Sequence, residues 1–72
     1  MKLSARNQLT GKVVNVVHGN IMAEVVVELD GGQRVTAVIT SQSAKSLKLE
    51  AGTQVAAVIK STDVMIGLPE SA

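Results

Sequence analysis

Residues 21–30 alternate between two kinds of position and then run into two glycines. The odd positions are all apolar, whereas the even positions include two glutamates and an aspartate. Because successive side chains of a strand point to opposite faces, this period of two predicts a strand whose odd face is buried. The tripeptide Asp30-Gly31-Gly32 supplies the positive φ angles that a tight hairpin requires. The chain is therefore expected to fold around a strand that turns back on itself.

Other segments have the same strand-like character. Residues 9–17 are rich in β-branched valines and lack the period of an amphipathic helix, and the tripeptide His18-Gly19-Asn20 that follows predicts a turn. In the segment after the two glycines, Val35, Ala37 and Ile39 fall on one predicted inward face. Pro69 is expected to end the last strand, because proline has no N–H for a ladder. The predicted strands cover residues 9–17, 21–30, 33–40, 53–60 and 64–68.

The period changes at Ser41, which is predicted to be the N-cap of a short helix. Ala44 and Leu47 would share one face of this helix, and Gly52 would end the segment in a left-handed turn. Five short strands with one short helix between the third and the fourth is the element order of a small OB-like barrel. We therefore expect an all-β fold, with residues 1–72 forming a single domain.

The length and composition of the chain predict an oligomer. A chain of 72 residues buries only about 60% of its unfolded surface, so its core is small. The absence of cysteine excludes a disulfide framework, and one histidine cannot build the usual structural zinc site. Nevertheless 46% of the residues are hydrophobic and the mean hydropathy is +0.30. This aliphatic surface exceeds what one small core hides, so we expect burial between subunits.

Charge and aromatic content argue against nucleic-acid and membrane partners. The net charge is +1, and no run of like charge resembles a polybasic arm. Single-strand binders stack bases on aromatic side chains, and this chain has none. The first residues lack an apolar signal core, and no apolar stretch approaches the roughly 20 residues of a membrane span. A cytoplasmic protein is expected.

Two short segments concentrate hydrogen-bond donors. Lys60-Ser61-Thr62-Asp63 lies between two apolar runs, and Ser4-Ala5-Arg6-Asn7 lies near the start of the chain. Lysine supplies three N–H groups and each hydroxyl supplies one, which suits an oxyanion. A polar turn with Lys60 in solvent is the alternative, and Arg6 taken alone is more typical of an ordinary surface charge.

These segments, together with Gly11-Lys12-Val13-Val14 and Ala23-Glu24-Val25, resemble the molbindins, small cytoplasmic Mop-like proteins that bind molybdate. The resemblance covers essentially the whole chain. It implies a five-stranded OB-like barrel, a hexamer arranged as a trimer of dimers, and oxyanion sites between subunits. It also implies storage and homeostasis of molybdate, or of tungstate.

In the main site that the resemblance implies, one subunit supplies the start of its chain and its neighbour supplies hydroxyls and a lysine. The first set falls on Ser4, Ala5 and Arg6, and the second set falls on Thr40, Ser43, Lys60 and Ser61. A second kind of site near the three-fold axis would involve Gly19, Asn20 and His18, although a histidine in a turn is more often an ordinary surface residue.

The residue types fit a fully deprotonated tetrahedral dianion. Molybdate and tungstate need donors and no acceptor, whereas hydrogen phosphate carries a proton that needs an acceptor. Asp63 is the one carboxylate near these donors in the sequence. Sulfate has the same charge and shape as molybdate, so only the size of the cavity separates the two.

An enzyme is not expected. The single histidine has no identifiable partner, and the chain has no cysteine nucleophile and no Gly-rich phosphate loop. No residues are expected to ligate a cation directly. The remaining alternative is an interaction or regulatory module whose assembly with a protein or nucleic-acid partner is tuned by an oxyanion.

Overall fold

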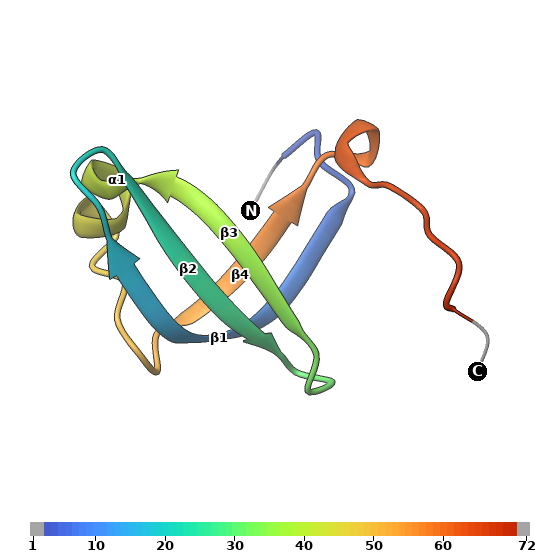
Figure 1. The fold of residues 1–72 in the computed structure, drawn as a ribbon, viewed down its shortest axis with the longest axis horizontal. Helices are drawn as coiled ribbons and strands as arrows, with labels where there is room; N and C mark the ends of the chain where they lie inside the picture. The colour runs from blue at the N-terminus through green and yellow to red at the C-terminus, as the bar shows by residue number, and fades with distance from the viewer. Residues whose placement is uncertain (1–2, 71–72) are drawn as a thin grey trace.

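Four antiparallel strands form one curled sheet in the order β3-β2-β1-β4 (Figure 1). The computed structural model describes residues 3–70. Within them one short α-helix follows β3 and one 3₁₀-helix follows β4, so the predicted all-β class with one short helix is confirmed. The elements are β1 (Asn7–His18), β2 (Met22–Leu29), β3 (Arg34–Thr40), α1 (Ser41–Ser46), β4 (Gln54–Ile59) and η1 (Ser61–Asp63).

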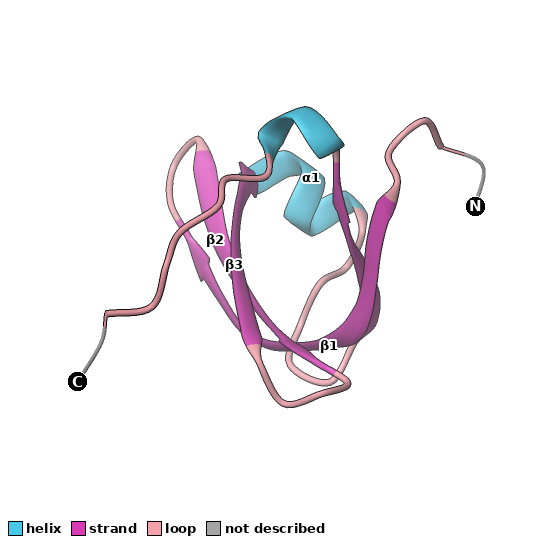
Figure 2. Ribbon diagram, turned by 90° about the vertical axis from the view of Figure 1, so that its right-hand side faces the viewer, coloured by secondary structure: helices cyan, strands magenta, loops and turns pink. Residues whose placement is uncertain are grey.

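Strand β1 pairs with both β2 and β4, and these two pairings curl the sheet. Its first half pairs with β4, beginning at Asn7 opposite Ile59, and its second half pairs with β2. Gly11 lies where the two pairings overlap, and a Cβ there would collide with the Glu28 carbonyl oxygen. A register shift that includes Val14 adds local twist. The sheet therefore folds over onto itself, as Figure 2 shows.

The core lies inside this curl and is small. The predicted alternation on β2 is confirmed, because Ala23, Val25 and Val27 are buried while their even-numbered neighbours are exposed or half-buried. Ile21, which was predicted to share the buried face, is 76% exposed. That prediction is wrong because β2 begins at Met22 and Ile21 belongs to the preceding turn. Partly buried residues surround the core: Val16, Leu29, Ile39, Leu49 and Val55.

The hairpin between β2 and β3 forms at the predicted glycines. Gly32 has a φ of 92°, and its N–H donates to the Leu29 carbonyl at 2.8 Å. The Leu29 N–H in turn donates to the Gln33 carbonyl at 2.7 Å. On β3, Val35, Ala37 and Ile39 are half-buried between exposed neighbours, as the alternation predicts.

The helix α1 begins one residue earlier than predicted. Its N-cap is Thr40, whose Oγ1 accepts the Ser43 N–H at 3.0 Å, so the assignment of Ser41 as N-cap is wrong. Ser41 is instead buried inside the helix. Ala44 is buried as predicted, but Leu47 is exposed at the C-cap. Gly52 has the predicted positive φ of 95° and lies in the loop before β4.

The predicted fifth strand, residues 64–68, is not formed. This segment is extended but has no regular secondary structure, and in Figure 1 it leaves the body of the fold after η1. Its apolar side chains are exposed, including Met65 at 92% and Ile66 at 90%. A strand needs a partner for its backbone N–H and C=O groups, and within residues 3–70 this segment pairs with none. No helix of the described chain is long and apolar enough to cross a membrane.

Candidate oxyanion site

Thr40 and Ser43 form a hydroxyl pair at the start of α1. The chain leaves β3 at Thr40 with a ψ of 146°, and its side chain caps the helix by accepting the Ser43 N–H. The Thr40 hydroxyl donates to Ser43 Oγ at 2.7 Å. Because Ser43 Oγ acts as acceptor in this bond, its own proton is free to be donated outward. Both residues are exposed, so a ligand can reach them.

A surface hollow of about 430 Å³ lies beside this pair. Its polar lining consists of three hydroxyls and one carboxamide, and it includes no carboxylate. Gln42 and Ser46 were missed by sequence reasoning, although Ser46 follows Ser43 at the i, i+3 spacing of a helix face. The lining residues are Thr40, Gln42, Ser43, Ser46 and Leu47.

Residues 4–6 and residues 60–61 lie at one end of the sheet. Asn7 and Ile59 are paired, so the chain enters β1 where it also leaves β4. Lys60 is extended, and its carbonyl accepts the Asp63 N–H at 2.9 Å. Ser4, Arg6, Lys60 and Ser61 are exposed, whereas Ala5 is half-buried and its carbonyl accepts from Gln8 Nε2 at 3.4 Å.

The cations at this end are not neutralised within the described part of the chain. The single ion pair found among residues 3–70 joins Arg34 to Glu28 at 3.6 Å, on a different part of the sheet. Asp63, which follows Lys60 closely in sequence, therefore does not pair with it. The Lys60 ammonium keeps its donors for solvent or for a ligand.

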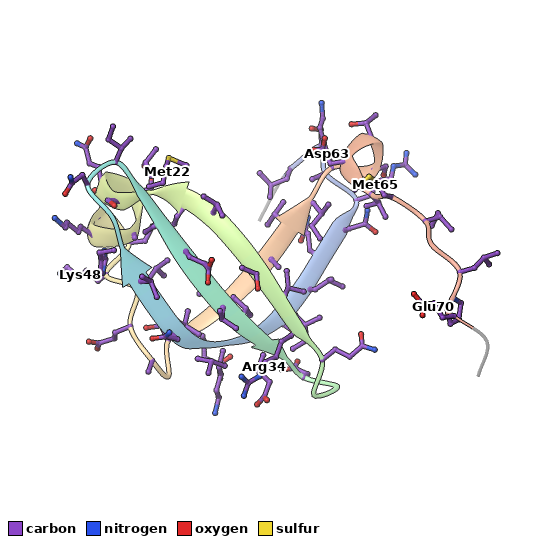
Figure 3. The ribbon with its side chains drawn as sticks, viewed as in Figure 1. Met22, Arg34, Lys48, Asp63, Met65 and Glu70 are labelled. Atoms are coloured by element: carbon purple, nitrogen blue, oxygen red, sulfur yellow. The ribbon has the colours of Figure 1, made fainter. Side chains whose placement is uncertain are left out.

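One chain does not bring these two groups together. Thr40 is paired with Met22 near α1, whereas Lys60 and Ser61 lie at η1. In Figure 3, Met22 marks the α1 end and Asp63 marks the η1 end, and the two ends are well separated. The predicted main site is therefore divided within a single chain into the Thr40–Ser43 pair and a group formed by residues 4–6 and 60–61.

The residues predicted for the second site form an exposed turn close to α1. His18 ends β1, and the Gly19 N–H donates to the Met22 carbonyl at 2.8 Å. His18, Gly19 and Asn20 are all exposed. The turn thus adjoins the Thr40–Ser43 pair rather than Lys60. Within residues 3–70, no group of three or more His, Cys, Asp or Glu side chains is placed to hold a metal ion.

Comparison with known proteins identifies the family. The TOBE domain family matches residues 3–66. The chain belongs to the TOBE domain family. Molybdenum-pterin-binding protein 3 of Clostridium pasteurianum is 56% identical over 66 residues, which cover 92% of this chain and 97% of that protein. The resemblance to the small Mop-like proteins is therefore confirmed for this TOBE domain chain.

Solved structures agree with the fold. A molybdate-binding protein from Sporomusa ovata matches with a TM-score of 0.88 and 35% identity, over 94% of this chain and 100% of that chain. The cytoplasmic molybdate-binding protein ModG, solved with molybdate bound, matches with a TM-score of 0.90 and 40% identity. That match covers 96% of this chain but 49% of ModG. The OB-like architecture of this TOBE domain is thus shared with these proteins.

Proposed function

We propose that this TOBE domain protein binds molybdate, or its analogue tungstate, and serves molybdate storage and homeostasis in the cytoplasm. The observation that carries the proposal is the Thr40–Ser43 hydroxyl pair beside a hollow without a carboxylate. The Sporomusa ovata relative is described as a molybdate-binding protein, and ModG as a cytoplasmic one with molybdate bound. These descriptions favour a binding protein over an enzyme. They also favour it over a module that recruits a protein or nucleic acid.

The chemistry of the donors supports a fully deprotonated dianion. Ser43 has a hydroxyl proton directed to no partner in the described chain, and Lys60 has an ammonium group outside any ion pair there. Ser4 and Ser61 add hydroxyls, and the backbone N–H groups of residues 5 and 6 add further donors. Hydrogen bonds that involve a charged group are shorter and stronger than neutral ones, so such a set favours an anion.

A complete main site requires more than one subunit. Within one chain Thr40 and Ser43 lie at α1 whereas Lys60 and Ser61 lie at η1, so a site that uses all of these residues would be assembled between copies. We propose that residues 4–6, 60 and 61, which lie at the same end of one subunit, meet Thr40 and Ser43 of a neighbouring subunit. Molybdate or tungstate would be the bound ligand, and the turn of His18, Gly19 and Asn20 would form a second site between subunits.

Exposed apolar surface supports an oligomer, which we propose to be a hexamer arranged as a trimer of dimers. On the outer face of the sheet, Val17 and Val38 flank Glu24 in one cross-strand row, and both valines are exposed. Met65 and Ile66 are exposed beyond η1. Full burial of one such aliphatic side chain contributes about 1.5–3 kcal/mol, so covering these residues favours association.

Sedimentation equilibrium of the wild-type protein is expected to give a single species near six times the chain mass of 7.5 kDa. The physical reason is that apolar residues of the sheet and of the C-terminal segment leave solvent only when copies associate. Substituting Val38 with glutamate beside Glu24 should weaken the assembly, whereas the same substitution at exposed Gln33 should not. A clean monomer of the wild type at micromolar concentration would contradict the proposal.

Titration calorimetry with four oxyanions tests the function itself. Molybdate and tungstate are expected to bind much more tightly than sulfate, and phosphate is expected to bind most weakly. Hydrogen phosphate carries a proton that needs an acceptor, and the hollow beside Thr40 offers only hydroxyl and carboxamide oxygens, which accept less strongly than a carboxylate. Sulfate is smaller, so donors spaced for molybdate do not all reach it. Equal affinities for phosphate and molybdate would rule out the proposed donor chemistry.

A further inference from the structure

Ser41 is the only buried polar side chain among residues 3–70, with 5% of its surface exposed. A buried hydroxyl requires a hydrogen-bond partner. Ser41 Oγ donates to the Gly19 carbonyl at 2.7 Å, and the Ser41 N–H donates to the Ile21 carbonyl at 2.7 Å. Both donors of Ser41 are therefore used inside the fold. Ser41 cannot contact a ligand in this arrangement, so its role must be exerted through its neighbours.

The turn that Ser41 holds is tightly closed. The Gly19 N–H donates to the Met22 carbonyl across residues 19–22. A Cβ at Gly19 would lie 2.7 Å from the Met22 carbonyl oxygen, so the chain passes too closely here for a side chain. Ser41 donates hydrogen bonds to two carbonyls of this turn, those of Gly19 and Ile21. One residue thus joins the turn between β1 and β2 to the first turn of α1.

Thr40, the residue before Ser41, supplies one hydroxyl of the Thr40–Ser43 pair. Thr40 and Met22 are paired across β3 and β2, so the Thr40 backbone lies next to the same turn. The Thr40 side chain is directed to Ser43, while the Ser41 side chain is directed to Gly19. Because Thr40 and Ser41 share a peptide bond, any shift of Ser41 moves the backbone that orients the Thr40 and Ser43 hydroxyls.

We infer that Ser41 is a positioning residue that links the two candidate oxyanion positions of this chain. It fixes the Thr40–Ser43 pair relative to the turn of residues 18–20, although it is itself buried and its two donors are used inside the fold. The two Ser41 hydrogen bonds join this turn to the segment that carries the Thr40–Ser43 pair. This inference rests on the proposed function, because it concerns how that site is held.

The test compares Ser41→Ala with Val13→Ala in the otherwise intact protein. Val13 is buried in the core, so Val13→Ala lowers stability without touching the Ser41 hydrogen bonds. In molybdate titrations, Ser41→Ala is expected to weaken binding by about 3- to 10-fold, which is the worth of one lost hydrogen bond. Val13→Ala is expected to lower the melting temperature but to leave the affinity unchanged. Equal affinities in wild type and Ser41→Ala would overturn the inference.

Amide hydrogen exchange without ligand separates this inference from the proposed function. The Ser43 N–H donates to Thr40 Oγ1, so its exchange reports on the hydroxyl pair directly. It is expected to exchange faster in Ser41→Ala than in Val13→Ala. If the wild type bound no molybdate, the proposed function would fail, and this exchange rate would still decide the positioning role. Equal protection of Ser43 in the two variants would show that Ser41 does not hold the pair.

Discussion

Gly11→Ala is expected to destabilise the fold by about 3 kcal/mol or more, the upper part of the range for overpacking a tightly packed site. The added Cβ would collide with the Glu28 carbonyl oxygen and would lie 3.0 Å from Leu29 Cα. Both contacts are with backbone, so no side-chain rotation relieves them. A chain of this length is stable by only about 4–11 kcal/mol as a monomer, so the loss is a large part of the total.

The measurement is the midpoint of urea unfolding followed by circular dichroism, at equal protein concentrations. Gly31→Ala is the matched control, because a Cβ at Gly31 meets nothing within 4 Å and its φ is not positive. It should unfold at nearly the wild-type midpoint. A Gly11→Ala protein as stable as Gly31→Ala would mean that β1 does not pass as close to β2 as the structure places it.

Removing residues 1–6 is expected to abolish the stabilisation that molybdate gives to the wild type. If these residues complete each main site between subunits, their loss removes part of every such site. A ligand that binds only the folded assembly raises its stability by mass action, so the melting temperature with and without saturating molybdate measures this contribution. A truncated protein that retained the full wild-type shift would exclude residues 4–6 from the site.

In the same experiment, Lys60→Ala is expected to weaken the binding of molybdate without abolishing it. Loss of one hydrogen bond to a charged partner costs about 1.5–3 kcal/mol, so the affinity for molybdate should fall by roughly 10- to 150-fold. Lys12→Ala is the control, since Lys12 is exposed and lies opposite Gln54, at the far end of β4 from Lys60. It makes the same change in net charge. Equal losses in the two variants would indicate a general charge effect rather than a contact by Lys60.

Features with a short-range cause could be predicted from the sequence. The alternation of residues 21–30 predicted that Ala23, Val25 and Val27 are buried, because the period of a strand is local. The positive φ at Gly32 and Gly52 was likewise predicted, since each depends on the sterics of one residue. Membership in the family was readable from the short motifs near the two ends of the chain.

Features that depend on distant partners could not be predicted in this way. Thr40 and Ser41 both carry hydroxyls suited to an N-cap, and the fold selected Thr40 because Ser41 is turned inward to reach Gly19. The need for glycine at position 11 arises because β1 pairs there with both β2 and β4. Neither the choice of N-cap nor the need for this glycine can be recognised from the residues nearby in the sequence.

The sequence by itself therefore determined the strands β1 to β4, the main turns and the types of donor, because these follow from side-chain period and backbone sterics over a few residues. The tertiary structure alone decided which donors meet. The pairing of Asn7 with Ile59 brings residues 4–6 to the end where Lys60 lies, whereas Thr40 and Ser43 lie at the start of α1. The tertiary structure also decided that residues 64–68 remain unpaired within residues 3–70. An apolar pattern favours a strand, but it cannot supply the neighbouring strand whose backbone completes the hydrogen bonds.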